Sequence, residues 1–103
     1  MAVKILIKRK FKAADFNTIS RVLRQARLGA MEQEGYISSE TLWDHDDPAR
    51  VVVASMWQSL DHWKRYTASE TRKASETLFN EMLATPAEYE YFALGLYPHR
   101  TDT

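Results

Sequence analysis

The sequence contains no cysteine and only three glycines and three prolines among its 103 residues. Without cysteine there is no disulfide framework, no thiolate metal ligand and no cysteine nucleophile, and we expect a protein of the reducing cytoplasm. So little glycine and proline, with 45% hydrophobic residues, is typical of a folded domain rather than a fibrous or disordered chain. No hydrophobic run approaches the roughly 20 residues of a membrane-spanning helix, so no membrane partner is expected.

The chain also has no net charge, because 14 basic residues balance 14 acidic ones. This balance argues against a protein built to hold polyanions. It hides an asymmetry: residues 1–28 carry eight basic and one acidic side chain (+7), whereas residues 29–103 carry six basic and thirteen acidic ones (−7). Because no linker separates these parts, we expect two oppositely charged surfaces of one domain covering residues 1–103, which favours self-association.

The spacing of the hydrophobic residues predicts the first half of the fold. Apolar and basic side chains alternate over residues 3–12, which is typical of a half-buried strand. The helix that follows should have Asp15 as its N-cap and should end at Gly35 in the left-handed conformation. Two strands, residues 36–44 and 50–57, then flank an aspartate-rich turn.

The second half repeats this order with a broken helix. Ser59 can cap a short helix, a longer helix covers about residues 69–84, and the last strand covers residues 88–97. The order is therefore βαββαβ with the second helix broken in two, which is the ferredoxin-like α+β arrangement of four antiparallel strands with the helices on one face. We expect the core at about residues 2–97 and a loose tail at residues 98–103.

The predicted strands are apolar on both faces. Val51, Val53 and Trp57 alternate with Val52, Ala54 and Met56 in one strand, and Phe92, Leu94 and Leu96 alternate with Tyr89, Tyr91 and Tyr97 in the last. Because the helices cover one face only, the open face needs a second cover. We infer a homodimer that packs through the open sheet face.

Residues 57–69, WQSLDHWKRYTAS, resemble the antibiotic biosynthesis monooxygenase (ABM) family. In that family a tryptophan ends the third strand, a serine or aspartate opens the next helix, and an aromatic-rich stretch follows. Trp57 and Ser59 match these positions, and the resemblance covers roughly residues 2–97. It implies a dimeric α+β barrel with one pocket per subunit, between the sheet and the helices.

Activities in that family include cofactor-independent oxygenation of quinols and polyketide phenols, and oxidative haem breakdown. The haem-degrading branch requires an asparagine on the first strand, a tryptophan in the broken helix and a histidine later in the chain. An alignment on Trp57 puts Lys8, Tyr66 and Glu76 at these positions. Because a carboxylate poorly replaces an axial imidazole, we expect no haem degradation.

The cofactor-independent branch implies a monooxygenase without a prosthetic group, using molecular oxygen and a small aromatic substrate such as a quinol or phenol. That chemistry needs a flat apolar pocket, a base and a group that holds an oxyanion. His62, beside the aromatic cluster, is the candidate base, and Arg72 or Arg9 could hold the oxyanion. The predicted catalytic residues are His62, Tyr66 and Arg72, and the predicted pocket residues are Arg9, Trp57, Trp63 and Glu76.

Each candidate also has a structural interpretation. Aromatic residues at helical spacing usually belong to the core, and the two tryptophans could simply pack there. His62 could be an exposed partner of the helix start. Arg72 and Glu76, four residues apart, could form a surface ion pair, and Arg9 could extend from the strand end to water.

Other ligand classes are disfavoured. Residues 44–47, Asp-His-Asp-Asp, are ligand types for hard metals, but consecutive residues on a turn point in different directions, so we expect a solvated hairpin turn and no metal. The basic residues 8–12 invite an RNA-binding interpretation, but the strands lack the exposed aromatic pattern that stacks bases, so no nucleic acid is expected. The sequence contains no glycine-rich phosphate loop or dinucleotide fingerprint.

Two functions from different classes therefore stay open, and a third, a haem binder, is kept only for completeness. One is the cofactor-independent monooxygenase. The other is a non-catalytic small-molecule-binding or stress-related dimer of the same fold, because one fold hosts many activities.

Overall fold

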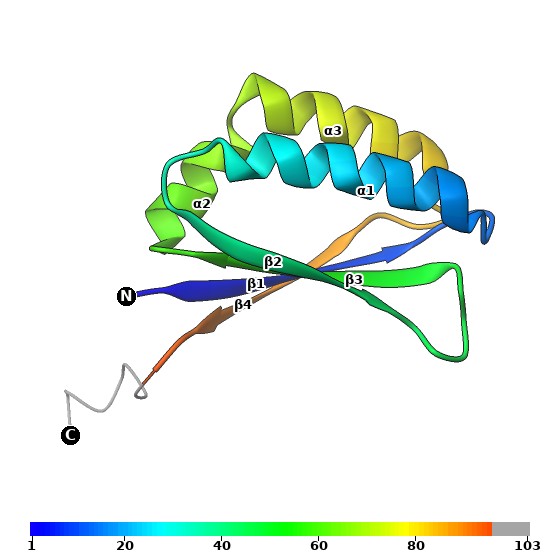
Figure 1. Cartoon of the computed structure of the whole chain (residues 1–103), viewed down its shortest axis with the longest axis horizontal. Helices are drawn as coiled ribbons and strands as arrows, with labels where there is room; N and C mark the ends of the chain where they lie inside the picture. Colours follow the sequence, from blue (N-terminus) through cyan, green and yellow to red (C-terminus); the bar gives the residue numbers. More distant parts are fainter. Residues whose placement is uncertain (96–103) are drawn as a thin grey trace.

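The computed structural model describes residues 1–95. In this part of the chain the elements are β1 (Val3–Lys10), α1 (Phe16–Met31), β2 (Tyr36–Trp43), β3 (Arg50–Trp57), α2 (Leu60–Thr67), α3 (Glu70–Met82) and β4 (Glu88–Ala93). The strands form one antiparallel sheet in the order β2-β3-β1-β4, and the helices lie on one side of it (Figure 1). The predicted ferredoxin-like α+β fold, with its broken second helix, is confirmed.

Several element boundaries differ from the prediction. Helix α1 ends at Met31, so the prediction that Gly35 ends the helix is wrong. Gly35 does adopt the left-handed conformation, with φ of +89°, but it does so in the turn that leads into β2. Strand β4 ends at Ala93, and the predicted tail, residues 98–103, lies outside the described residues.

Each helix begins at a side chain that caps its first turn. The side chains of Asp15, Ser59 and Ser69 accept hydrogen bonds from the backbone N–H groups three residues later. Such caps satisfy donors that have no partner within the helix. Because Ser69 starts a new helix directly after α2, the break between α2 and α3 is made by two separate helices rather than by a bend. Within residues 1–95 no helix is long and apolar enough to cross a membrane.

The core lies between the helices and the covered face of the sheet, in two clusters. Phe11 and Phe79 are at the centre of one cluster, under α1 and α3. Trp57 is at the centre of the other and is fully buried, with its ring stacked on Tyr66 at 4.9 Å and edge-on to Trp63 at 5.9 Å between centroids. Burying aromatic rings of this size contributes a few kcal/mol each, so this cluster anchors α2 to the sheet.

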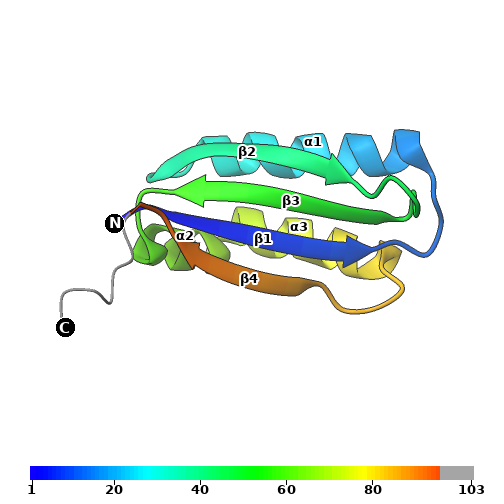
Figure 2. The same cartoon turned by 90° about the horizontal axis from the view of Figure 1, so that it is seen from below.

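The other face of the sheet is left open by the helices of residues 1–95, and Figure 2 shows it from that side. It is not uniformly apolar. Phe92, which is 50% exposed, lies beside Lys4 of β1, which also pairs with Met56 of β3. Lys8 forms an ion pair with Glu90 across the same face at 3.0 Å. The predicted apolar second face is therefore a mixture of apolar and charged side chains.

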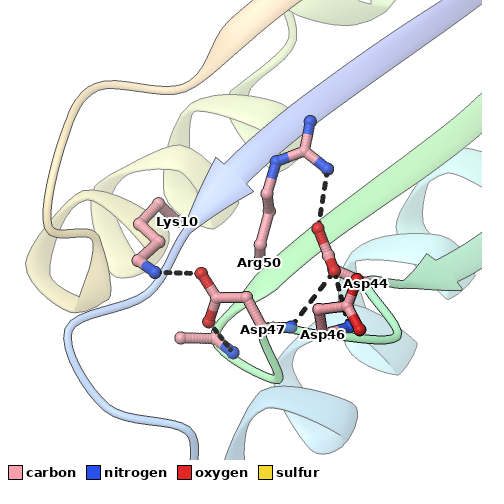
Figure 3. A network of polar contacts seen from close by, with 6 residues as sticks. Lys10, Asp44, Asp46, Asp47 and Arg50 are labelled. Carbon is pink, nitrogen blue, oxygen red and sulfur yellow. Dashed lines mark hydrogen bonds and ion pairs between the residues drawn. The ribbon is translucent and has the colours of Figure 1, made fainter.

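The turn between β2 and β3 is held by its own aspartates (Figure 3). The Asp44 carboxylate accepts hydrogen bonds from the backbone N–H groups of Asp46 at 2.8 Å and Asp47 at 3.1 Å, and from Arg50 at 3.2 Å. Asp47 pairs with Lys10 at the end of β1. These backbone hydrogen bonds are the main cause that lowers the pKa of Asp44. The predicted hairpin turn is confirmed, and within residues 1–95 no group of three acidic or histidine side chains is placed to hold a metal ion.

Candidate functional site

A cleft of about 780 Å³ opens between α2, α3 and β4. Its apolar walls come from Leu60 and Trp63 of α2 and from the ring of Tyr91 on β4. Its polar wall is one side of α3, with Arg72, Lys73, Glu76, Thr77 and Asn80. A volume of this size, with apolar walls and a few convergent polar groups, is typical of a small-molecule site.

A connected group of polar side chains lies at the inner end of this cleft. Arg72, Glu76 and Tyr89 line the cleft, and Arg9 lies behind them. We call these four residues the arginine cluster. One carboxylate oxygen, Glu76 Oε1, lies 2.7 Å from Arg72 Nη2 and 3.2 Å from Arg9 Nη2. Arg72 Nη2 also donates to the Tyr89 hydroxyl at 2.8 Å. The two arginines are only 3% and 4% exposed, so two buried guanidinium groups share one carboxylate.

The arginine cluster carries one uncompensated positive charge. Burial is the main cause that raises the pKa of Tyr89 above its usual 10.0, so its hydroxyl stays neutral at physiological pH. Burial, and then the charge of Arg72, lowers the pKa of Arg9 from 12.5, but guanidinium groups in proteins stay protonated. Two cations and one carboxylate leave a net charge of +1 beside the cleft.

Aromatic rings hold both guanidinium groups in place. Arg9 Cζ lies 3.8 Å from the centroid of the Phe79 ring. Arg72 Cζ lies 5.6 Å from the ring of Trp63 and 5.5 Å from that of Tyr66. Cations over aromatic faces gain about 1 kcal/mol or more when desolvated, which offsets part of the cost of burial. The aromatic residues therefore orient the arginines as well as shaping the walls.

Of the predicted residues, Trp63, Arg72 and Glu76 line the cleft. Arg9 and Tyr66 lie deeper, on a small cavity between the sheet and the helices. Two of the structural interpretations are wrong. Arg9 does not extend to water, and the pair of Arg72 and Glu76 is not a surface pair, because both arginines are almost fully buried.

Trp57 and His62 lie away from the cleft that residues 1–95 form. Trp57 is 0% exposed, and its indole N–H donates to Ser55 Oγ at 2.7 Å inside the core. His62 Nδ1 lies 2.7 Å from Ser59 Oγ, and Nε2 lies 3.5 Å from Glu34. The His62 ring also packs on Gly35, where an added Cβ would be 2.2 Å from its Cγ. These contacts join α2 to the turn before β2, and the catalytic role of His62 stays an untested prediction.

Sequence reasoning missed Tyr89 and most of the polar wall. Lys73, Thr77 and Asn80 follow one another at the spacing of a single helix face, in line with Glu76, and that signal was available. Tyr89 could be assigned to the site only through the strand register, in which it pairs with Ile7 of β1.

The fold and the cleft define a ferredoxin-like α+β domain with a ligand-sized site between its broken helix and an edge strand. The model of one protein family, Antibiotic biosynthesis monooxygenase, matches residues 2–77. The chain therefore belongs to this family. The match includes Arg9, Trp63, Arg72 and Glu76 but stops before Tyr89.

Comparison with solved structures shows the same fold at low identity. A conserved protein from Methanosarcina mazei Go1 has a TM-score of 0.83 at 15% identity, over 92% of this chain and 94% of that one. SnoaB, a cofactor-independent oxygenase from Streptomyces nogalater, has a TM-score of 0.82 at 15% identity, over 96% and 98%. A structure named antibiotic biosynthesis monooxygenase has a TM-score of 0.80 at 13% identity, over 90% and 98%. Comparison with curated protein sequences gives no match.

Proposed function

We propose that this protein is a cofactor-independent monooxygenase that oxidises a small aromatic substrate, of the quinol or phenol type, in the cleft. Membership of the ABM family and the likeness to SnoaB support this proposal. The observation that carries it is the uncompensated positive charge of the arginine cluster at the inner end of a cleft with aromatic walls. Such a site suits a flat ring that binds as an anion.

The side chains that line the cleft support one mode of binding. In the proposed complex the ring of the substrate lies between Trp63 and Tyr91, and its oxygen substituent faces Arg72. The Tyr89 hydroxyl accepts a hydrogen bond from Arg72 and keeps its own proton, which it can donate to the substrate oxygen. Because Tyr89 stays neutral, it donates to the substrate anion without repelling it.

The substrate itself supplies the electrons. The positive charge of Arg72 lowers the pKa of the substrate, which loses its proton to solvent, and the anion so formed is electron-rich enough to reduce oxygen. The keto tautomer of such a phenol carries an activated methylene group in its ring, and for it the balance is R₂CH₂ + O₂ → R₂C=O + H₂O. One oxygen atom forms the new carbon–oxygen bond, and the other leaves as water with both hydrogens. The protein binds the ring, holds the negative charge and limits contact with water.

Oxygen uptake with a panel of hydroquinones and anthrones tests this function. We expect turnover without added haem, flavin or metal, and a loss of roughly 100-fold in kcat/KM for Arg72→Gln, as when an oxyanion-stabilising donor is removed. Arg65→Gln is the matched control, because Arg65 lies on the neighbouring helix, is 67% exposed and contacts Glu34 rather than the cleft. Circular dichroism checks that both variants are folded.

The alternative is a non-catalytic protein of the same fold that binds a small molecule. Tight binding of the panel compounds in the cleft, with no oxygen uptake above background, would contradict the oxygenase proposal and favour this alternative. Binding that is lost in Arg72→Gln but kept in Arg65→Gln would still assign the cleft as the ligand site.

We also propose that the working unit is a homodimer joined through the open sheet face. Exposed apolar side chains such as Phe92 and Leu42, 50% and 47% exposed, alternate there with charges of both signs. Sedimentation at micromolar concentration should give about twice the chain mass of 12.0 kDa. Phe92→Glu should give monomers, whereas Leu78→Glu, at a 41% exposed position on α3, should not. A monomer in the wild type would contradict the proposal.

A further inference from the structure

A second cavity, of about 40 Å³, lies between α1 and the covered face of the sheet. We call it the inner cavity. The charged side chains that line it are all arginines, Arg9, Arg27 and Arg72, and Ser55 and Thr41 add hydroxyl groups. The residues that line it within the described part of the chain include no acidic side chain. Its environment is therefore positively charged and able to donate hydrogen bonds.

Arg9 has an unused hydrogen-bond donor at this place. Its side chain is 3% exposed, one Nη is bound to Glu76, and the guanidinium plane lies over Phe79. Its Nε is buried and has no hydrogen-bond partner among residues 1–95. A buried N–H without an acceptor costs roughly 1–3 kcal/mol, and such groups are rare in native proteins. Arg9 lines two spaces in which an acceptor could lie, the inner cavity and a recess of about 110 Å³ whose lining includes Glu88. Of these two, the inner cavity is the one without an acidic side chain among its described lining residues, so it is the one that favours an anion.

The net charge of the arginine cluster also has no counter-charge within the cluster. Arg9 and Arg72 share Glu76, and Tyr89 is neutral, so a charge of +1 stays on two guanidinium groups that are almost fully buried. An unpaired buried charge is costly, by several kcal/mol after relaxation. Water in the inner cavity would supply an acceptor for Arg9 Nε, but only an anion would supply both the acceptor and the charge.

A basic groove on the surface adjoins the inner cavity. The groove, of about 210 Å³, lies between α1 and β2 and has Arg24 and Arg27 on its α1 side, both exposed. It shares Leu23, Arg27 and Thr41 with the inner cavity. Exposed charges of one sign at the mouth of a cavity raise the local concentration of the opposite ion. Two of the residues that give positions 1–28 their excess of positive charge, Arg24 and Arg27, therefore lie together at this groove.

We propose that the inner cavity is a binding site for a small monovalent anion, of the size of a halide, which pairs with Arg9 and enters through the groove between Arg24 and Arg27. A volume of about 40 Å³ has room for about three water molecules, since each needs roughly 10–15 Å³ of such space. A halide fits this volume, whereas gluconate and other large organic anions do not.

This site has a consequence that rests on the proposed oxygenase function. The substrate anion at Arg72 and the small anion at Arg9 share one unit of positive charge, although they occupy different cavities. Each should therefore weaken the binding of the other by the same factor. Chloride would then raise the KM for an ionised substrate and leave that for a neutral analogue unchanged. Binding of the anion itself can be measured without any turnover.

Bromide locates the site directly. Crystals of the full chain grown in sodium bromide should give an anomalous difference peak in the inner cavity, within hydrogen-bond distance of Arg9 Nε. A cavity that holds only water at high bromide concentration would overturn the proposal.

Thermal unfolding measures the affinity. At equal ionic strength, Tm should be higher in sodium chloride than in sodium gluconate. For a domain of this size the difference should be roughly 5–10 °C when the chloride concentration is ten times the Kd for chloride. Arg9→Met should abolish this difference, because the remaining pair of Arg72 and Glu76 is neutral. Arg65→Met is the matched control and should keep it.

Arg27→Gln keeps the test decisive if Arg9→Met does not fold. Arg27 is exposed, so its replacement should not unfold the protein, and the chloride concentration that gives half of the Tm rise should increase several-fold. Equal Tm values in chloride and gluconate, or an undiminished chloride effect in the arginine variants that fold, would overturn the proposal.

Discussion

Glu76 should be the residue on which the stability of the arginine cluster depends. Its Oε1 atom accepts from both Arg9 and Arg72, at 3.2 and 2.7 Å, and it is the one acidic group of the cluster. Glu76→Gln keeps the shape and the accepting oxygen but removes the charge. The net charge of the cluster then rises from +1 to +2, with both guanidinium groups still buried.

The expected cost is about 3 kcal/mol of unfolding free energy. Removing one partner of a buried ion pair costs roughly 3–5 kcal/mol, mostly through the charge that is left unpaired. The Glu76 side chain is 24% exposed, so solvent screens part of the interaction and the lower end of this range applies. Because domains of this size have about 5–15 kcal/mol of stability, the variant should still fold.

Urea unfolding at one fixed protein concentration measures this cost, with the concentration held constant in case of dimerisation. Glu70→Gln is the control, because Glu70 lies on the same helix but its side chain is 95% exposed, and the loss there should stay below about 0.5 kcal/mol. The double variant Arg9→Met/Glu76→Gln restores a charge of +1 and should be more stable than Glu76→Gln by at least about 1 kcal/mol. A loss below about 1 kcal/mol in Glu76→Gln, or strictly additive effects in the double variant, would refute the reasoning.

Three further predictions concern the neighbouring structure. Gly35→Ala should cost at least about 3 kcal/mol, because φ is +89° and the new Cβ would clash with His62. Gly95→Ala, with φ of +91° and no atom of residues 1–95 within 4 Å of the new Cβ, should cost about 1–2 kcal/mol, and equal losses in urea unfolding would argue against the clash. The pKa of Tyr89 is raised in the folded state, so above pH 10 the tyrosine ionises more readily in the unfolded state. Its contribution to stability is therefore present below pH 10 and is lost as the pH rises above 10. Tyr89→Phe should make the urea midpoint fall less steeply at alkaline pH. Trp57→Phe should lower the unfolding free energy by about 2 kcal/mol, because a buried hydrogen bond is lost and a small void is left. Calorimetry should show that the affinity of the cleft for its ligand is unchanged. A change in affinity without a loss of stability would make Trp57 a pocket residue.

The fold was predictable from local signals. The alternation over β1 and the capping side chains at Asp15, Ser59 and Ser69 each act within a few residues, and together they give the element order and the break in the second helix. The end of α1 was misplaced because the left-handed glycine, Gly35, is typical both of helix ends and of turns.

The site was predictable in its residue types but not in its contacts. Arg9 and Glu76 meet although 67 positions separate them, and Tyr89 reaches Arg72 from a strand whose register no local pattern determines. The general rule that arginine is exposed favoured the wrong interpretation for both arginines. His62 was singled out for its chemistry and its neighbours in sequence, but its ring packs on the turn before β2.

The helical side of the cleft consists of two separately capped helices, α2 and α3, that meet at a short connection. Each helix has its own N-cap, Ser59 or Ser69, and only Ala68 and Ser69 lie between the two. Ser69 also ties the two helices together, because its N–H and its hydroxyl donate to the Tyr66 carbonyl at the end of α2, at 3.0 and 2.6 Å. The angle between the helices is therefore set at this one residue. Leu60 and Trp63 would move with one segment, and the polar wall with the other. Substrate breadth in proteins of this architecture can then evolve by substitutions at this connection, while the charged inner end of the cleft stays as it is.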